Sequence, residues 1–195
     1  MYQEWIENLL AQKTIFKTAD FTKAGIPRVY IKQLLDSDRL VKVDRGIYIK
    51  DWEHYDDFAI FQLKNQTVVY SYLSSLYLHE LTDVIPQYFE VTVYTGYNRH
   101  RISQDVRVHY VQKEFYELGK IDVLTPMGNT VTCYDMERTI CDLINSRSQI
   151  DIELFSSSLK AYLKSSQKDL RKLYQYAEAL KIRQKVKEIF EVIYE

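Results

Sequence analysis

The first fifty residues begin with apolar positions at helical spacing. An amphipathic opening segment is followed by a short second run, which Thr18 bounds as a predicted N-cap and Gly25 as a stop signal. Pro27 then suits the first turn of a third helix, in which Ile31 and Leu34 fall on one apolar face. The pattern therefore predicts three helices, of which the second is only a turn or two long.

The pattern changes to alternation in RLVKVDRGIYIK, residues 39–50. Apolar positions alternate with charged or aromatic ones on both sides of Asp44, Arg45 and Gly46, which supply the turn of a hairpin. Three helices followed by a hairpin is the order of a winged helix-turn-helix domain. We therefore predict such a domain over residues 1–50.

In this type of domain the third helix enters the major groove of DNA, and the wing lies along the neighbouring backbone or minor groove. The predicted DNA-binding residues lie on the outward face of the third helix and on the wing: Arg28, Val29, Lys32, Gln33, Lys42 and Arg45. Additional DNA or phosphate contacts are predicted for Lys23, Arg39, Arg99 and Arg101. The alternative is that these charged surfaces are solvated, or that they contact another protein.

The rest of the chain predicts an α+β fold with a second, larger domain. Acidic residues 51–57 indicate a linker, and residues 58–195 indicate a C-terminal domain with a small antiparallel sheet and a helical bundle. Helices are expected at 58–63 and 70–81 and from residue 135 to the end, and strands at 88–95, 106–113 and on both sides of Pro126, Met127 and Gly128. The segment 97–101 reads as an ordinary hairpin tip, although its arginines and tyrosine could also grip phosphate.

Charge is distributed unevenly over a chain whose formal net charge is −1. Residues 13–50 contain nine Lys and Arg against four Asp and Glu, whereas residues 51–150 contain eight against fourteen. This local excess of positive charge would favour an anionic partner for the N-terminal domain. The opening residues lack the basic and apolar regions of a secretory signal, and no stretch is apolar enough to span a bilayer, so cytoplasmic residence is expected.

The sequence contains no recognisable catalytic motif. It has no glycine-rich phosphate loop, no nucleophile elbow and no zinc-spaced His/Cys cluster, so we expect no catalytic residue, bound metal or cofactor. Cys133 and Cys141 are predicted to be reduced structural thiols. Asp135 and Glu137 superficially match the metal-binding carboxylates of nucleotidyltransferases, but here the pair is predicted to open a helix, with Asp135 as its N-cap.

Three segments in order resemble the AbiEi family of antitoxins from type IV toxin-antitoxin systems of abortive phage infection: FTKAGIPRVYIKQLLDSDRLVKVDRGIYI, SYLSSLYLHELTDVIP and TPMGNTVTCYDMERTICDLI. The resemblance implies a winged-helix domain that represses its own promoter by binding inverted repeats. It also implies a C-terminal domain that helps to neutralise a nucleotidyltransferase toxin, for which a stable complex is not required. Two copies could bind DNA cooperatively.

The chain departs from this family at two positions. Pro27 stands where the family usually has Ser or Thr, which removes a capping hydroxyl and a possible phosphate ligand. Asp38 stands where the family often has Gly, which adds a negative charge near the DNA groove. Both differences are expected to affect operator affinity and not the fold. Glu137 and Arg138 match a family segment to which we assign a structural role. Our functional hypothesis is a non-enzymatic antitoxin and autorepressor. The alternative is a protein-interaction adaptor whose winged helix and C-terminal domain bind a partner protein.

Overall fold

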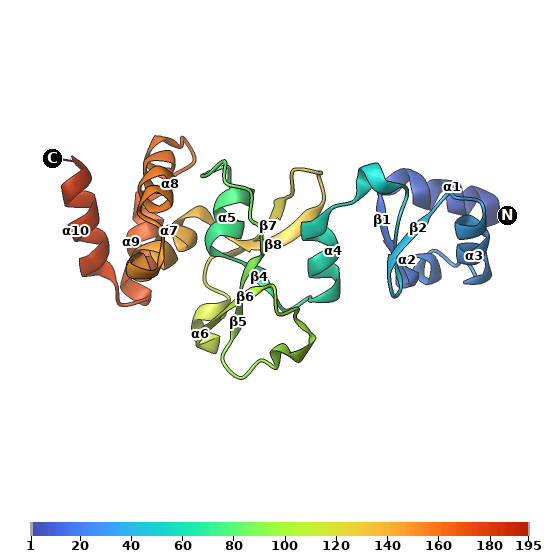
Figure 1. The fold of residues 1–195 in the computed structure, drawn as a ribbon, viewed down its shortest axis with the longest axis horizontal. Helices are drawn as coiled ribbons and strands as arrows, with labels where there is room; N and C mark the ends of the chain where they lie inside the picture. The colour runs from blue at the N-terminus through green and yellow to red at the C-terminus, as the bar shows by residue number, and fades with distance from the viewer. Residues whose placement is uncertain (1, 195) are drawn as a thin grey trace. The chain divides into compact units, whose positions relative to one another are not determined.

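The computed structural model describes residues 2–194, apart from the side chains of Arg101 and of residues 192–194. It divides into two compact units, Met1–Lys64 and Asn65–Glu195 (Figure 1). Sequence analysis placed a linker at 51–57 and began the second domain at residue 58, whereas this division falls after Lys64. Lys64, the last residue of the helix Asp57–Lys64, forms an ion pair with Asp44 of the hairpin, so this helix contacts the first unit.

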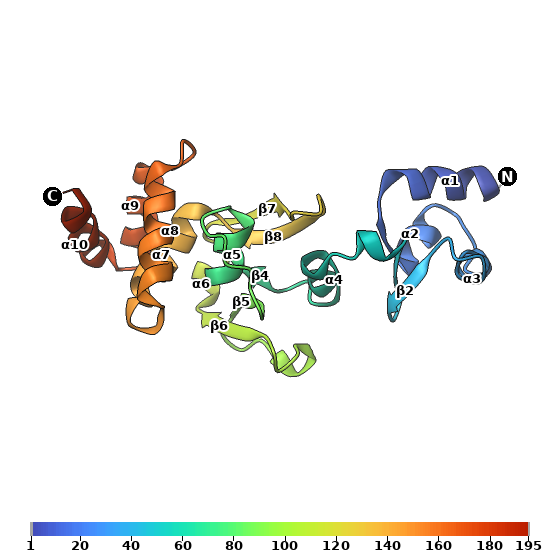
Figure 2. The same ribbon diagram turned by 45° about the horizontal axis from the view of Figure 1, so that its top comes forward.

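The first unit is a winged helix-turn-helix domain. Its helices surround a buried apolar cluster that includes Ile6, Phe16, Phe21 and Leu34. Figures 1 and 2 both show α2 and α3 close to strand β2. Its elements are α1 (Tyr2–Gln12), β1 (Ile15–Lys17), α2 (Thr18–Lys23), α3 (Val29–Asp36), β2 (Val41–Asp44), β3 (Ile47–Ile49), the 3-10 helix η1 (Trp52–His54) and α4 (Asp57–Lys64).

Two local features of this unit differ from the prediction. The sheet has a third strand, β1, which pairs antiparallel with β3 in the order β1-β3-β2. Its three residues are too short to show an alternating pattern, so only the tertiary pairing defines it as a strand. The N-cap of α2 is Lys17 rather than Thr18, because the Asp20 carboxylate accepts the Lys17 backbone N–H at 2.6 Å.

The second unit is built on a five-stranded sheet with the order β6-β5-β4-β8-β7. Helices α7–α10 gather on one side of it, next to α5, in both ribbon views (Figures 1 and 2). Its elements are β4 (Val69–Tyr70), α5 (Tyr72–Leu78), β5 (Glu90–Tyr94), the 3-10 helix η2 (Arg99–Arg101), β6 (Arg107–Val111), α6 (Lys113–Tyr116), β7 (Lys120–Leu124), β8 (Thr130–Tyr134), α7 (Met136–Asn145), the 3-10 helix η3 (Arg147–Gln149), α8 (Ile152–Lys164), α9 (Leu170–Ala179) and α10 (Arg183–Tyr194).

This sheet is mixed, so the prediction that it is antiparallel was wrong. Strands β5 and β6 run parallel, as do β4 and β8, while β4–β5 and β7–β8 are antiparallel. Residues 95–106 connect β5 to β6. They are long enough to bring the chain back to the edge of the sheet at which β5 begins, as a connection between parallel strands requires. Segment 97–101 is therefore part of a crossover and not a hairpin tip. Strand β4 takes the first residue of the predicted helix 70–81, which shortens that helix to Tyr72–Leu78.

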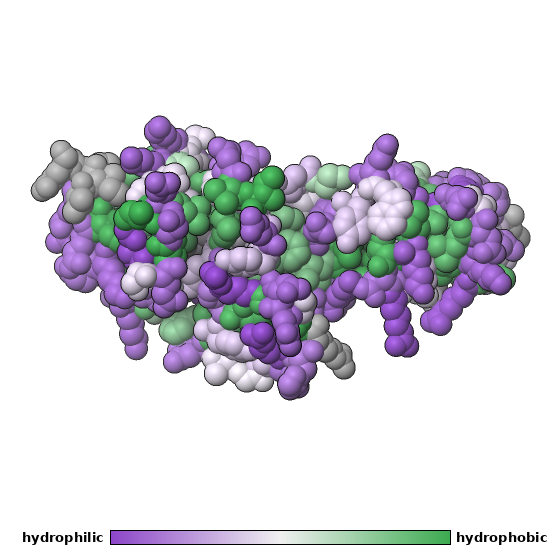
Figure 3. All heavy atoms as spheres, in the orientation of Figure 1, coloured by the Kyte–Doolittle hydropathy of each residue, from purple (hydrophilic) through white to green (hydrophobic). Residues whose placement is uncertain are grey.

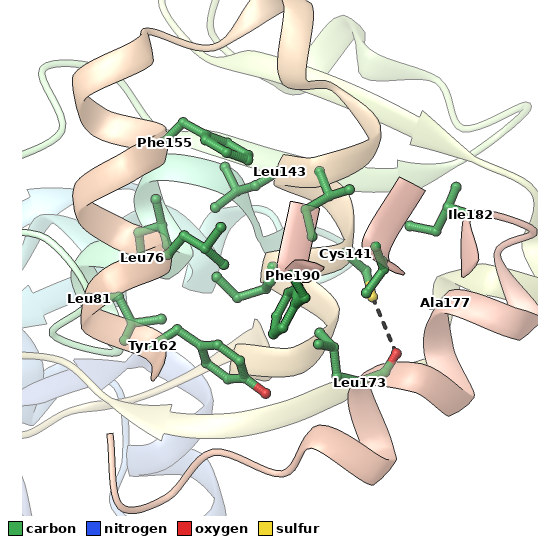
Figure 4. Packing of buried hydrophobic residues seen from close by; sticks show 14 residues of the cluster. Leu76, Leu81, Cys141, Leu143, Phe155, Tyr162, Leu173, Ala177, Ile182 and Phe190 are labelled. Atoms are coloured by element: carbon green, nitrogen blue, oxygen red, sulfur yellow. Dashed lines mark hydrogen bonds between the residues drawn. The ribbon is translucent and has the colours of Figure 1, made fainter. Parts of the chain in front are cut away.

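The main core of the second unit lies between α5 and the C-terminal helices. Leu76 of α5, Ile140 of α7 and Leu173 of α9 are almost completely buried in it, as is Tyr162 of α8 (Figure 4). Cys141 lies within this core, where its thiol contacts the carbonyl oxygen of Leu173 at 3.6 Å. Burial raises the pKa of both Cys133 and Cys141 to about 12, and both are free thiols, as expected for structural cysteines.

Arg138 is the largest fully buried side chain among the described residues. Its Nε donates to both carboxylate oxygens of Asp142 at 3.0 and 3.1 Å, and its Nη1 donates to the carbonyl oxygens of Phe115 and Leu118 at 2.7 and 2.9 Å. Its guanidinium also lies 4.4 Å from the centre of the Tyr134 ring. Arg138 thus joins α7 and β8 to α6 and to the loop before β7, which gives it the structural role that we assigned.

His109 on β6 is mostly covered and stacks on Tyr72 with 3.8 Å between ring centroids. Burial, aided by the charge of Arg107, lowers the pKa of His109 to about 4. An unfolded histidine titrates near pH 6.5, so the folded state binds fewer protons between about pH 6.5 and 4. The stability contributed by neutral His109 is therefore complete above about pH 6.5 and is lost as the pH falls towards 4.

We predict that wild-type protein loses up to about 3 kcal/mol of stability relative to His109→Phe when the pH is lowered from 7 to 4, because one pKa unit corresponds to about 1.4 kcal/mol. Urea unfolding of both proteins at several pH values measures this difference and cancels the titration of all other groups. A difference in unfolding free energy that does not change with pH would contradict the assignment.

Candidate nucleic-acid interface

The turn between α2 and α3 fixes the direction of the third helix. Gly25 adopts a φ of 72°, and the backbone N–H of Ile26 donates to the carbonyl of Phe21 at 2.8 Å. The Ile26 side chain is then buried in the core of the unit. This arrangement ends α2 and redirects the chain into α3, as a helix-turn-helix motif requires.

Helix α3 presents a polar outer face. Its Ile31 and Leu34 side chains are buried, which leaves the opposite side of the helix in solvent. All four residues predicted to contact DNA from this helix are exposed: Arg28, Val29, Lys32 and Gln33. The outer face of the helix is therefore a surface, as predicted. Pro27, however, precedes the helix, and Arg28 occupies its N-cap position.

The wing is a short hairpin anchored to the start of α2. Gly46 adopts a φ of 72° in the turn, and its carbonyl accepts the backbone N–H of Thr18 at 3.0 Å. The predicted contact residues Lys42 and Arg45 are both exposed on it. Thr18, read from the sequence as a cap, instead fixes the position of the wing turn. Only the pairing of distant segments reveals that role.

The Lys and Arg side chains of the first unit fall into two groups, according to whether they form an ion pair. Lys13 pairs with Asp20 at 2.8 Å, and Lys64 pairs with Asp44, whose pKa is held below its usual value by that lysine. By contrast, a second group is exposed and forms no ion pair within the part of the chain that the structure describes: Lys23, Arg28, Lys32, Lys42 and Arg45. In the view of Figure 3, hydrophilic side chains cover much of the surface of the first unit.

The other residues predicted to contact phosphate are three arginines, which differ in their surroundings. Arg39 is held by Glu7 of α1 at 2.8 Å, and this bond lowers the pKa of the Glu7 carboxylate. Arg99 is exposed in η2 of the second unit, and the side chain of Arg101 lies outside the described residues. Of these three, Arg39 belongs to the first unit, where it follows α3 and is paired with Glu7.

The end of α3 explains why glycine suits position 38. Asp38 adopts a left-handed φ of 54°, the N–H of Asp38 donates to Leu35 at 3.2 Å, and the N–H of Arg39 donates to Leu34 at 2.9 Å. This is a Schellman motif, in which the left-handed residue is usually glycine because a Cβ atom is unfavourable there. The sequence alone showed only the added negative charge.

We predict that Asp38→Gly stabilises the first unit by about 0.5–1 kcal/mol and also strengthens DNA binding by removing a negative charge beside α3. Ser37→Gly is the matched control, since Ser37 has a φ of −101° and its hydroxyl donates to Gln33 at 2.8 Å. This control should lower stability. Urea unfolding followed by tryptophan fluorescence distinguishes the two outcomes, and a destabilised Asp38→Gly variant would contradict the backbone argument.

Part of the first unit matches a known protein family. Residues 6–49 match a protein-family model described as "Transcriptional regulator, AbiEi antitoxin". Residues 6–49 of this chain are therefore similar to the AbiEi-type transcriptional regulators. The predicted resemblance is thereby confirmed for residues 6–49, and the match supports a role as an antitoxin and transcriptional regulator. No curated protein matches the chain.

The fold also resembles a solved structure. The crystal structure of the RV2827C protein from Mycobacterium tuberculosis matches with a TM-score of 0.54 and 11% sequence identity, over 88% of this chain and 69% of that chain. At this identity the likeness extends to the fold alone. The family match ends at residue 49, so these comparisons assign no function to the second unit.

The described residues show no membrane-spanning or metal-binding feature. Within 2–194, no helix is long and apolar enough to cross a membrane, and no group of three or more His, Cys, Asp or Glu could hold a metal ion. Asp135 caps α7 and contacts Lys172 at 2.7 Å, and Glu137 accepts the Asp169 N–H at 2.9 Å. This setting differs from a nucleotidyltransferase metal site, because a lysine ammonium occupies the position next to the carboxylates.

Proposed function

We propose that this protein is a DNA-binding autorepressor that also acts as the antitoxin of a type IV toxin-antitoxin system. The observation that carries the proposal is the set of exposed cations on α3 and the wing that form no ion pair among the described residues. These elements lie within residues 6–49, which match the AbiEi antitoxin model. A helix and a wing that present such cations can contact consecutive phosphates on both sides of one major groove. Inverted repeats in the protein's own promoter would then bind two copies.

The antitoxin part of the proposal concerns a nucleotidyltransferase toxin and does not require a stable complex with it. It is supported by the match of residues 6–49 to an AbiEi antitoxin model, and by the resemblance that we drew from sequence for the two later segments. We further infer that the chain itself is not an enzyme. In support, Asp135 and Glu137, its closest approach to a catalytic pair, are buried and bonded to neighbouring residues of the same unit.

A gel-shift titration tests the DNA-binding part directly. Purified protein is titrated against the DNA upstream of its own gene at two salt concentrations, with a scrambled duplex as competitor. The expected result is a specific shift that weakens with salt and steps up as a second half-site fills. If no specific shift occurs, the repressor proposal is wrong and co-purification with the product of an adjacent gene becomes the next test.

We predict that the fragment 1–64, which ends at the observed boundary, represses more weakly and protects less well than the full chain, because it lacks the second unit. Repression is measured with a promoter fusion, and protection as survival of cells expressing the toxin. Circular dichroism of the purified fragment serves as the folding control. Full repression and protection by a folded fragment would show that the second unit contributes to neither activity.

A further inference from the structure

Val29 lies at the centre of the outward face of α3. At about 100° per residue, Val29 points directly away from the midpoint between Ile31 and Leu34, which are each 5% exposed. Lys32 and Gln33 flank it on either side of the helix. The Val29 side chain itself is 57% exposed, so the most outward residue of a polar helix face is apolar.

Charge along α3 indicates which end of the helix approaches DNA. Arg28 and Lys32 are exposed in its first half, whereas Asp36 and Asp38 are exposed at its end. A groove lined by phosphates attracts the first half and repels the second, so the helix enters by its N-terminal end. This orientation places Val29 against the base edges, while the two aspartates stay outside the groove.

An isopropyl group at this place has few suitable partners. It cannot hydrogen-bond, and covering a polar base edge with it would leave that edge desolvated and unpaired. The major groove offers one apolar group, the 5-methyl of thymine, which alkyl side chains contact in direct readout. Gln33, one helical turn further along the same stripe, carries the amide that can pair with adenine.

We infer that Val29 is a specificity-determining residue, which selects a thymine in each operator half-site through contact with its 5-methyl group. This inference rests on the proposed DNA-binding function and adds the identity of the base that α3 reads. It predicts that affinity depends on a single methyl group of the DNA at one position in each half-site.

The test removes that methyl group without changing base pairing. In the full-length protein's operator, each thymine is replaced in turn by deoxyuridine, and the dissociation constant is measured by gel shift. Wild-type protein should lose affinity about fourfold at one thymine per half-site, which is the effect of leaving one methyl group unburied. The same set of duplexes is then titrated with Val29→Ala and with Lys32→Ala.

The two variants separate the methyl contact from general binding. Val29→Ala should bind the thymine and deoxyuridine operators equally well at the sensitive position, whereas Lys32→Ala should bind more weakly overall and keep the fourfold ratio. The inference is overturned if no thymine is sensitive, or if Val29→Ala keeps the ratio. Both results would still leave specific operator binding intact, so they differ from failure of the proposed function, in which no operator is bound specifically.

Discussion

Replacing Arg138 by methionine is expected to destabilise the second unit by about 3–5 kcal/mol, because it leaves the Asp142 carboxylate buried without its partner. Arg138 is fully buried, and the substitution also removes the two hydrogen bonds that its Nη1 donates to backbone carbonyls. Burial already raises the pKa of Asp142 to about 6 despite the nearby guanidinium. Without Arg138 this carboxyl group would become still harder to ionise.

The two units can be followed separately in this experiment. Both tryptophans, Trp5 and Trp52, lie in the first unit, so tryptophan fluorescence reports its unfolding. Far-ultraviolet circular dichroism also records the helices of the second unit. In urea, Arg138→Met should shift the circular-dichroism transition of the second unit and leave the tryptophan transition unchanged. A loss below about 1 kcal/mol would mean that the buried pair is not essential.

A second substitution shows whether the unpaired charge is the cause. The double variant Arg138→Met, Asp142→Leu removes both charges, and it should be more stable than Arg138→Met alone. The bonds to Phe115 and Leu118 are lost in both variants, so the difference between them isolates the carboxylate. If the double variant were less stable than the single one, packing around Asp142 rather than its charge would dominate.

Removing three interface cations together is expected to weaken operator binding about a thousandfold. Each contact made by Arg28, Lys32 or Arg45 with a phosphate or base should contribute about 1.4 kcal/mol, which is a tenfold change in affinity, so the loss of all three costs about 4 kcal/mol. Each lost phosphate contact also makes the log-log dependence of affinity on salt shallower by about 0.9. Gel-shift titrations of the triple alanine variant at several salt concentrations measure both quantities.

Lys13→Ala provides the matched control for this experiment. Lys13 belongs to the same unit, but its ammonium is paired with Asp20, so its removal should leave the salt dependence unchanged. Lys32→Ala and Arg45→Ala tested singly identify which cation meets the backbone. A triple variant whose affinity and salt dependence equal those of the wild type would place the DNA-binding surface elsewhere.

The sequence by itself determined the elements that depend on neighbouring residues. Periodicity predicted α1, α3 and the C-terminal helices, the turn at Asp44–Gly46 predicted the wing, and Asp135 was recognised as the cap of α7. The exposed face of α3 followed from the same periodicity, since a helix that buries Ile31 and Leu34 must expose the residues between them.

Tertiary structure decided whatever depends on segments distant in the chain. Strand β1 exists only through its pairing with β3. The parallel pairing of β5 with β6 depends on the crossover 95–106, which no local pattern distinguishes from a hairpin loop. The ion-pair partners of charged residues likewise cannot be predicted from the sequence. Arg39 and Arg45 look alike there. In the structure, however, Arg39 is paired with Glu7, whereas Arg45 forms no ion pair with any residue that the structure describes, because the partner of a charge is whatever lies near it in space.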